Sequence, residues 1–420
     1  MKILVIGNGA REHALAWKIS QSKLVTKIFV APGNAGTSLE PMLKNIPIQS
    51  TNLQKLLSFA IAEEIDLAIV GPEAPLLLGI VDVFRKAGIK IFGPTQAAAV
   101  LEGSKIFSKN FLVRHGIPTA EYNDFTEVAP AVQYVREKGT PIVIKANGLA
   151  AGKGVIIADT LQDAELVIKG ILCENAFGSA GNRIIIEEFL EGEEISFIVM
   201  VDGNNILPMA TSRDYKRVGD NNTGLNTGGM GAYSPVTFVT NEMHQRIMTE
   251  IIYPTVHGMM SEGSPYTGFL YAGLMIDRYN QIKVIEFNCR LGDPESQPMM
   301  LRLKSDLVDL CLAAINRELD QRSIIWDPRP AVGLVLASRG YPEKYVKGYK
   351  INGLPVSEIL GCKVFHAGTV FQDDAIITDG GRVLCVTALG ENMSEAKNHV
   401  YQVSSLISWK DKFFRTDIAN

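Results

Sequence analysis

The segment Val284-Ile285-Glu286-Phe287-Asn288 combines an apolar strand pattern with two polar side chains. Residues two apart on a strand face the same side, so Glu286 and Asn288 present two oxygen ligands together. Such a pair suits Mg²⁺ bound to nucleotide phosphates. Arg290 follows closely enough to neutralise an anionic intermediate. The structural alternative is an exposed strand edge followed by a turn.

A glycine-rich segment, Gly148-Leu-Ala-Ala-Gly152-Lys153-Gly154, is the second candidate site, with Lys145 just before it. A Walker A loop would open a helix with GK[ST], whereas this loop opens a β-branched strand. Glycines let the backbone approach phosphate oxygens, and lysines supply mobile positive charge. The segment therefore predicts a hairpin that folds over a triphosphate, with a flexible hairpin and solvated lysines as the alternative.

The N-terminal run Gly7-Asn8-Gly9-Ala10-Arg11-Glu12 begins like a dinucleotide fingerprint. Glu12 replaces the third glycine, and Ala31-Pro32-Gly33 stands where an acidic ribose ligand is expected. A nicotinamide dehydrogenase is therefore disfavoured. The turn itself is equally compatible with phosphate binding at a helix start and with a purely structural role.

The acidic run Glu187-Glu188-Phe189-Leu190, with Glu194 beyond it, could form an adenine cleft between domains. Taken alone, such a run is more often a solvated turn. The six histidines have no metal-ligand spacing, and no Ser/His/Asp grouping can be argued, so the sequence gives no basis for a hydrolase.

The elements that must position these residues begin with alternating strands and helices. We expect helices over 10–19 and around Leu77 to Phe84, and strands over 3–6, 28–30, 66–70 and 89–92. Short βα units of this kind predict a doubly wound parallel sheet, with ligands at the carboxyl ends of its strands.

The rest of the chain predicts α/β and α+β domains. A helix is expected over 104–115, a long functional loop over 214–235 and a linker over 326–330. Strands are expected over 141–145, 155–158, 184–189, 195–201, 273–277, 282–287, 332–337, 363–366 and 383–388. We divide the chain into an N-terminal Rossmann-like domain (1–103), a middle domain (104–325, with a lid at about 120–190) and a small C-terminal α+β domain (326–420).

Composition narrows the functional class. The 420 residues carry a net charge of −4, which gives no reason to expect nucleic acid or anionic membrane as a partner. No apolar run approaches the roughly 18–20 residues of a membrane span. Five scattered cysteines without CxxC spacing fit a reducing cytoplasm better than a disulfide framework or zinc site.

These residues resemble the ATP-grasp superfamily and, within it, the phosphoribosylamine–glycine ligase family over essentially the whole chain. The segments that carry the resemblance are Gly7–His13, Gly71–Leu76, Lys145–Gly154, Asn226–Pro235 and Glu286–Glu295. The resemblance implies that ATP, glycine and 5-phosphoribosylamine give glycinamide ribonucleotide, ADP and phosphate in purine biosynthesis. A carboxylate is a poor electrophile, so it would first be phosphorylated and then attacked by the amine.

The resemblance also implies roles for individual residues. Mg²⁺ or Mn²⁺ would bind Glu286 and Asn288. ATP would contact the residues Lys105, Lys145, Gly148, Gly152, Lys153, Gly154, Glu187, Glu188, Phe189, Leu190 and Glu194. Arg290, Lys145, Asp214 and Lys216 would be catalytic. The sugar amine and glycine would contact Gly9, Arg11, Glu12, Gly71, Pro72, Glu73, Arg290 and Pro294.

Four positions depart from the family pattern: Asn147 replaces Asp, Arg213 and Tyr215 replace Gln and His, and Leu225 replaces Pro. They bear on affinity and loop behaviour more than on reaction class. The alternatives are a sister ligase that uses formate or bicarbonate, and a regulatory protein with an inactive site. We expect a monofunctional cytoplasmic protein, with a transient hand-over from the amidotransferase that makes phosphoribosylamine.

Overall fold

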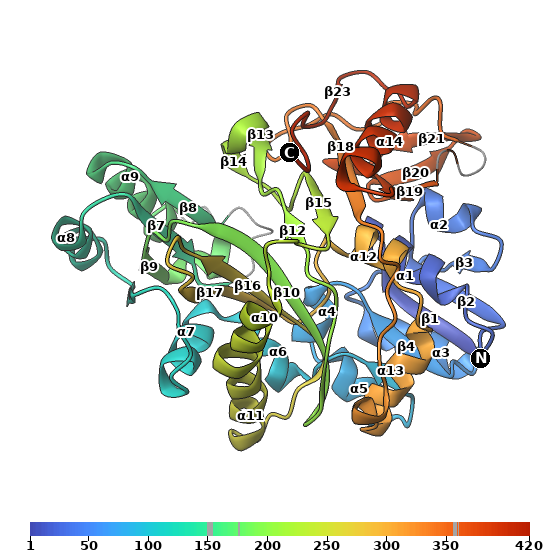
Figure 1. Cartoon of the computed structure of the whole chain (residues 1–420), viewed down its shortest axis with the longest axis horizontal. Coiled ribbons are helices and arrows are strands. Elements are labelled where there is room, and N and C mark those ends of the chain that lie inside the picture. The colour runs from blue at the N-terminus through green and yellow to red at the C-terminus, as the bar shows by residue number, and fades with distance from the viewer. Residues whose placement is uncertain (149–153, 175–176, 356–358, 360) are drawn as a thin grey trace.

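The computed structural model describes residues 1–148, 154–174, 177–355, 359 and 361–420. Within these residues the chain forms four sheets of four or more strands and two small hairpins. Figure 1 places one four-stranded sheet at one end of the molecule and the N-terminal sheet at the other, with β10, β16 and β17 between them and the C-terminal strands above the N-terminal sheet. The predicted mixture of a parallel N-terminal sheet with further α/β and α+β units is confirmed.

The N-terminal sheet is parallel, in the order β3-β2-β1-β4-β5. Its central strand is almost completely buried because helices cover both faces. The strands are β1 (Lys2–Gly7), β2 (Lys27–Pro32), β3 (Leu43–Asn45), β4 (Leu67–Val70) and β5 (Ile91–Phe92). The helices are α1 (Ala10–Ile19), α2 (Ala35–Leu39), α3 (Leu53–Ala62), α4 (Glu73–Leu77), α5 (Ile80–Lys86) and α6 (Gln96–Gly103).

The helix expected around Leu77 to Phe84 was predicted wrongly as a single element. The structure ends α4 at Leu77 and begins α5 at Ile80. Gly79 between them has φ +84°, a left-handed conformation that interrupts a right-handed helix. The split turns the chain and leaves Glu73 in the first turn of a short helix of its own.

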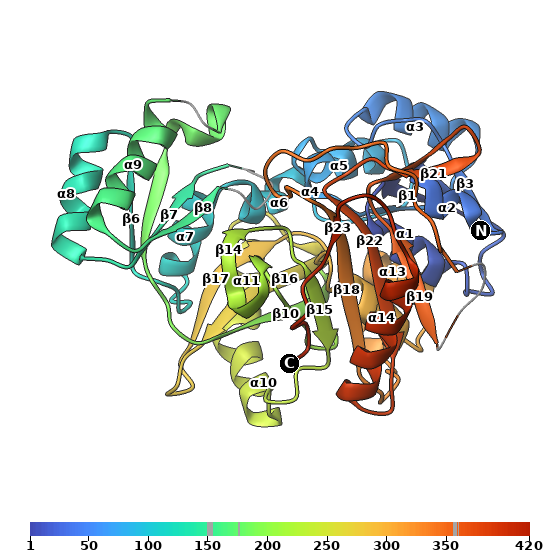
Figure 2. The same ribbon diagram turned by 90° about the horizontal axis from the view of Figure 1, so that it is seen from above.

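The sheet at the far end, which we call the lid sheet, is antiparallel in the order β6-β9-β7-β8. Figure 2 shows its two helices packed on one side of it, away from the N-terminal sheet. It has its own core, which includes Ile144, Ile168 and Ile186. The elements are β6 (Tyr122–Phe125), α8 (Val128–Lys138), β7 (Ile142–Ala146), β8 (Val155–Ala158), α9 (Leu161–Leu172), the 3₁₀ turn η1 (Gly178–Asn182) and β9 (Ile184–Glu188).

The central sheet is antiparallel, in the order β11-β10-β16-β17. Strand β16 begins at Thr267, well before the Gly273 start expected from the sequence. The strands are β10 (Glu193–Asp202), β11 (Ile206–Pro208), β16 (Thr267–Ile276) and β17 (Ile282–Asn288). The neighbouring helices are α7 (Lys105–Arg114), α10 (Asn241–Ile247), the π-helical η3 (Met248–Ile252), α11 (Tyr253–Ser261), α12 (Ser296–Arg302), α13 (Leu307–Asn316) and the 3₁₀ turn η4 (Leu319–Gln321).

The last sheet joins two widely separated parts of the chain in the order β12-β15-β18-β22-β19, with β23 beside β18. Its strands are β12 (Arg213–Asp214), β15 (Gly231–Ser234), β18 (Ala331–Ser338), β19 (Cys362–His366), β22 (Arg382–Leu389) and β23 (Lys412–Phe413), and α14 (Met393–Leu406) packs on it. The hairpins are β13 (Arg217–Gly219) with β14 (Thr223–Asn226), joined by the turn η2 (Asp220–Asn222), and β20 (Thr369–Gln372) with β21 (Ala375–Thr378).

The expectation of a long loop over 214–235 is therefore wrong. Strands β12 and β15 pair with each other, and β15 pairs with β18 about a hundred residues later. Short strands with many Gly, Asn and Thr residues carry little periodicity, so only this distant partner defines them.

Within the described ranges, none of the helices has the length and apolar character that a membrane crossing requires. None of the five cysteines, all of which the structure describes, forms a disulfide, and four of them are buried. Burial raises the pKa of the Cys385 thiol to about 12, so it stays protonated at neutral pH.

Candidate active site

A cavity of about 730 Å³ is lined by residues from the lid sheet, the central sheet, the N-terminal part of the chain and the last sheet. We call it the central cavity. Its size is in the range of sites for nucleotides and similar small molecules. Its walls include Lys145 and Glu187 from the lid sheet, Glu286 from the central sheet, and Arg382 from the last sheet.

On the lid side, two lysines share one carboxylate. Lys145 Nζ donates to Glu187 Oε2 at 2.9 Å, and Lys109 Nζ lies 3.1 Å from the same oxygen. The other oxygen of Glu187 is buried without a partner among the described residues. Burial lowers the pKa of Lys109 to about 8 and also lowers that of Lys105, whose Nζ donates to Gly148 O at 3.0 Å. This side of the cavity therefore combines three lysine side chains with one buried carboxylate oxygen that has no hydrogen-bond partner among the described residues.

The segment after β9 links the lid sheet to the central sheet. The side chain of Glu187, near the end of β9, lines the central cavity, and so do Phe189 and Leu190. Glu188 accepts from Glu121 N at 3.0 Å and pairs with Lys283. Glu194, at the start of β10, pairs with Lys216. The structure thus brings the whole predicted nucleoside segment to one side of the central cavity.

Glu286 and Asn288 lie near the end of β17 and both line the central cavity. Burial would raise the pKa of Glu286, but nearby cations led by Lys216 outweigh it and lower that pKa to about 2. Lys216 Nζ lies 3.4 Å from Glu286 Oε1, and Asn288 Oδ1 accepts from Arg290 Nη2 at 3.0 Å. Glu286 is therefore ionised at neutral pH and faces a cluster of cations.

Arg290 is held by carboxylates from the N-terminal part of the chain. Its Nε lies 2.9 Å from Glu73 Oε2, and its Nη2 lies 2.9 Å from Glu102 Oε1. Burial opposes ionisation of both acids. The guanidinium groups of Arg290 and Arg11 nevertheless lower the pKa of Glu73 to about 2, whereas burial raises the pKa of Glu102 to about 7. The conformation of Arg290 is thus fixed by the fold before any ligand binds.

Asp214 and Lys216 also line the central cavity, where Lys216 pairs with Glu194 and Glu286. Burial would lower the pKa of Lys216, but Glu194, Glu286 and Asp214 raise it well above its ordinary value. Burial raises the pKa of Asp214, and the neighbouring Glu295 adds to that rise. This part of the cavity therefore combines a permanently charged ammonium with a carboxyl that can hold a proton.

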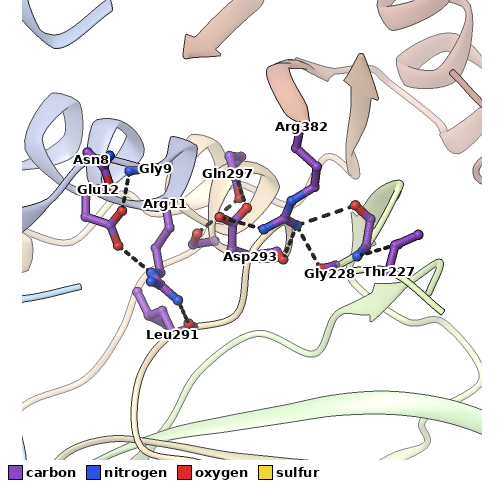
Figure 3. A network of polar contacts seen from close by, with 12 residues as sticks. Asn8, Gly9, Arg11, Glu12, Thr227, Gly228, Leu291, Asp293, Gln297 and Arg382 are labelled. Carbon is purple, nitrogen blue, oxygen red and sulfur yellow. Dashed lines mark hydrogen bonds and ion pairs between the residues drawn. The ribbon is translucent and has the colours of Figure 1, made fainter. Parts of the chain in front are cut away.

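The predicted N-terminal residues divide into two groups. Arg11 and Glu73 line the central cavity. Glu12 lies behind Arg11, where its carboxylate accepts from Gly9 N at 2.6 Å and from Arg11 Nε at 2.6 Å (Figure 3). Gly71 packs on Glu12 so closely that a Cβ would lie 2.1 Å from Oε1. Gly9, Glu12 and Gly71 thus support Arg11 from behind.

Pro72 and Pro294 also lie in the supporting layer. Pro72 precedes the first residue of α4, so it sets the start of the helix that carries Glu73. Pro294 packs against Gly229, where a Cβ would lie 2.3 Å from its Cδ. Of the glycine-rich loop, Gly148 and Gly154 are described, and Gly154 lines the central cavity. Gly152 and Lys153 lie outside the described residues.

The departures from the family pattern make specific contacts. Asn147 Oδ1 accepts from Ile106 N at 3.0 Å, which ties the end of β7 to the start of α7. Arg213 pairs with Glu193 at 2.5 Å, and the Tyr215 hydroxyl accepts from Ala419 N at 2.9 Å. Leu225 is exposed on β14. Asn147 therefore supplies a neutral acceptor at a position where its oxygen caps a helix.

Three protein-family models match nearly all of the chain: the phosphoribosylglycinamide synthetase N domain over residues 1–102, its ATP-grasp (A) domain over 103–296 and its C domain over 331–420. The chain belongs to the phosphoribosylglycinamide synthetase family. The predicted resemblance is confirmed.

Relatives in this family match over the full length. The protein named phosphoribosylamine–glycine ligase of Vibrio parahaemolyticus is 64% identical over 418 residues, which cover 100% of this chain and 97% of the relative. The protein of the same name from Escherichia coli K12 is 64% identical over 419 residues, with coverage of 100% and 98%.

Solved structures agree with this family assignment. The crystal structure of phosphoribosylamine–glycine ligase from Thermotoga maritima matches with a TM-score of 0.88 at 32% identity and covers 100% of both chains. The biotin carboxylase domain of Hydrogenobacter thermophilus 2-oxoglutarate carboxylase, in complex with MgADP and bicarbonate, matches with a TM-score of 0.75 over 98% of this chain and 91% of that one. At 16% identity the second likeness is one of fold alone.

In this member of the phosphoribosylglycinamide synthetase family, several charged residues of the central cavity were given no role by sequence reasoning, and four of them make contacts that matter below. They are Glu102, Lys109, Asp293 and Arg382. Lys109 lies four residues after Lys105 on α7, and this spacing on one helix face could have revealed it. Glu102 and Arg382 reach the site from distant elements, and their local sequence carries no corresponding signal.

Proposed function

We propose that the chain joins glycine to 5-phosphoribosylamine with the hydrolysis energy of ATP, giving glycinamide ribonucleotide, ADP and phosphate. The observation that carries this proposal is the pair Glu286 and Asn288, which lines the central cavity together with Lys105 and Lys145, whose charges help to keep Glu286 ionised. The choice of glycine and phosphoribosylamine as substrates is based on the full-length relatives named phosphoribosylamine–glycine ligase, which are 64% identical to this chain.

The lid side is suited to the nucleotide. Lys145 and Lys105 would neutralise phosphate oxygens, and the segment Glu187–Leu190 would hold the base and ribose together with Glu194. The buried, unpaired Oε1 of Glu187 supports this assignment, because an unsatisfied acceptor beside the cavity is expected where a ligand N–H completes the hydrogen bonding. Gly148, Gly152, Lys153 and Gly154 would close over the triphosphate.

The donor set at β17 fits a hard divalent cation, Mg²⁺ or Mn²⁺. Glu286 is ionised and Asn288 offers an amide oxygen beside it. In the described part of the chain no group of three or more His, Cys, Asp or Glu side chains is arranged to hold a metal. Phosphate oxygens would therefore complete the coordination, as is usual for Mg²⁺. The ion would supply charge neutralisation to the transferring phosphoryl group.

The reaction follows from the electronic character of the substrates. The glycine carboxylate attacks the γ-phosphorus, the bond to the β-phosphate oxygen breaks, and ADP leaves. The amine of phosphoribosylamine then attacks the carbonyl carbon of glycyl phosphate, and inorganic phosphate leaves as the amine loses a proton. Arg290 and Lys216 would stabilise the developing negative charge, and Asp214 is positioned to accept the proton.

The remaining substrate contacts are assigned to the N-terminal side. Arg11 and Glu73 would meet phosphoribosylamine in the central cavity, with Gly9, Glu12, Gly71, Pro72 and Pro294 as their support. Catalysis would come mainly from holding the two substrates and the nucleotide in contact, since a weak electrophile gains most from positioning and charge neutralisation.

We also propose the division into domains 1–103, 104–325 and 326–420, with the lid at about 120–190. The self-contained core of the lid sheet supports it. The net charge of −4 supports small-molecule substrates over nucleic acid or membrane partners. A cytoplasmic location, with direct transfer of phosphoribosylamine from its amidotransferase, completes the proposal.

The test measures ADP and glycinamide ribonucleotide made by the purified protein from Mg²⁺-ATP, glycine and phosphoribosylamine generated in situ, omitting each in turn. Equal amounts of both products, formed only when glycine and the sugar amine are present, are expected. The Glu286→Ala variant should lose roughly 10³-fold in turnover and keep its fold. The matched control Glu250→Ala removes a half-buried glutamate outside the central cavity that pairs with Arg246.

Turnover supported equally by formate or bicarbonate would reassign the chain to a sister ligase activity. A folded protein that releases no ADP would point to an inactive site. Near-normal turnover by Glu286→Ala would remove the metal assignment while leaving the reaction in place.

A further inference from the structure

Both backbone groups of Gly228 are bound by side chains from the C-terminal part of the chain. Arg382 Nη1 donates to Gly228 O at 2.7 Å, and Gly228 N donates to the Tyr341 hydroxyl at 3.0 Å. The guanidinium lies directly against Gly228, where a Cβ would be 3.0 Å from Cζ. We call this arrangement of Gly228, Tyr341 and Arg382 the Gly228 clamp.

The guanidinium of the Gly228 clamp also holds a second loop. Arg382 Nη1 donates to Asp293 O at 2.6 Å, and Arg382 Nη2 lies 3.1 Å from Asp293 Oδ2 (Figure 3). The other carboxylate oxygen of Asp293 accepts from Gln297 Nε2 at 2.9 Å. One planar fork thus joins acceptors on two loops that are distant in sequence, a geometry that lysine cannot reproduce.

Each of these loops supports a cation of the central cavity. Thr227, next to Gly228, donates from its backbone N at 2.7 Å and from its hydroxyl at 2.8 Å to Lys216 O. The side chain of Lys216 then reaches Glu286. On the other loop, Asp293 is separated from Arg290 by only two residues, so the contact that holds Asp293 also restrains the backbone next to Arg290. The position of Arg382 therefore affects Lys216 through one loop and Arg290 through the other.

Tyr341 is itself fixed by packing beside Arg382. Its ring lies on Gly381, where a Cβ would be 2.2 Å from Cδ2. Arg382 and Tyr341 both line the central cavity, although their polar groups are directed at the backbone of the loop. Arg382 at the start of β22 and Tyr341 in the turn after β18 thus reach the site as two adjoining side chains.

We propose that Arg382 and Tyr341 are positioning residues for the ligation, because together they hold the two loops that fix Lys216 beside Glu286 and Arg290 beside Asn288 in the central cavity. This inference rests on the proposed function. It assigns the C-terminal part of the chain a role in the chemical step and in holding the non-nucleotide substrates. Nucleotide binding should change far less than the chemical step. Lys145 and Glu187 on the lid side make none of these contacts, and the clamp reaches the nucleoside side through the pair of Lys216 with Glu194.

The test compares wild type, Arg382→Lys, Tyr341→Phe and the double variant by steady-state kinetics, varying each of the three substrates. Arg382→Lys is expected to lower kcat/KM for phosphoribosylamine and glycine about 100-fold, as small misplacements of reacting groups do. Tyr341→Phe removes one hydrogen bond and should lower both about fivefold. The double variant should lose less than the product of the two effects, because both residues act on one loop.

Two further readouts separate positioning from a general structural role. The Kd for Mg²⁺-ADP should stay within twofold of wild type, and the melting temperature should change by less than about 3 °C. Arg329→Lys is the matched control. Arg329 is half-exposed, pairs with the buried Asp327 away from the residues that line the central cavity, and its variant should keep wild-type kinetics. If Arg382→Lys yields too little folded protein, the kinetics of Tyr341→Phe alone test the proposal, because this variant loses only one hydroxyl group.

Kinetics of Arg382→Lys and Tyr341→Phe within twofold of wild type would overturn the inference while the proposed function stands. A loss of activity matched by an equal loss of nucleotide affinity and of thermal stability would overturn it too, because the clamp would then be structural only. A wild-type protein that forms no glycinamide ribonucleotide would instead overturn the proposed function, so the two failures are distinct.

Discussion

Glu102 makes the stability of the fold depend on pH in an accessible range. Its side chain is buried against Arg290, with Oε1 2.9 Å from Nη2, and its Oε2 accepts from Cys289 N at 2.7 Å. Burial, together with the negative charge of Glu73, raises its pKa from 4.5 to about 7 in spite of Arg290. A raised carboxyl pKa means that the folded state binds the proton more tightly than the unfolded state.

The sign and size follow from these two pKa values. Below pH 4.5 Glu102 is protonated in both states and does not change the free energy of unfolding. Between pH 4.5 and about 7 the unfolded state loses its proton first, so the free energy of unfolding falls as the pH rises, and it levels off above pH 7. At ~1.4 kcal/mol per pH unit, Glu102 destabilises the fold by a further ~2.5 kcal/mol between pH 5 and pH 8. Glu73, whose pKa is about 2, stays ionised throughout and adds no slope.

The assay is thermal unfolding of wild type and Glu102→Gln at pH 5 and pH 8. For a chain of this length ~2.5 kcal/mol corresponds to about 3 °C, so the variant should gain about 3 °C relative to wild type on going from pH 5 to pH 8. The glutamine amide cannot accept from both Arg290 and Cys289, but that loss is the same at both pH values and cancels. Parallel curves for the two proteins, with Glu250→Gln as the control, would refute the reasoning.

Three other changes have defined outcomes. Lys145→Met should raise the KM for ATP about tenfold with little change in the KM for glycine, measured by ADP release. Asp214→Asn should lower kcat roughly 100-fold and abolish the acidic limb of the pH–kcat profile, because the proton acceptor is lost; an unchanged profile would exclude that role. Gly71→Ala would place a Cβ 2.1 Å from Glu12 Oε1 and should destabilise the fold by about 2 kcal/mol in denaturant unfolding, whereas Gly170→Ala, with nothing within 4 Å, should not.

Local patterns were sufficient for the buried elements. The run Ile3–Ile6 lies within β1, and the expected bounds Ala10–Ile19 and Val155–Ala158 are those of α1 and β8. These segments are long enough, and apolar enough, for their own residues to determine their conformation. Where a partner far along the chain determines the conformation, as for β15 against β18, the residues of the segment carry no local pattern that predicts it.

The site shows the same division. Residues from contiguous motifs, such as Glu286, Asn288 and Arg290, were found because strand spacing alone places them together. Glu102 and Arg382 were missed because each meets its partners only after separate sheets assemble. A buried acid beside an arginine, or an arginine that binds two loops, has no signature in a single segment.

The shared sheet has a consequence for how the protein is made. Strand β15 is synthesised about a hundred residues before β18, its neighbour, so during translation it waits with an unsatisfied edge. A chain released early, upstream of Ala331, would keep that edge open, and an open edge recruits strands from other chains. Completion of the C-terminal sheet is thus the step that protects the nascent polypeptide from aggregation, and premature termination products should be insoluble.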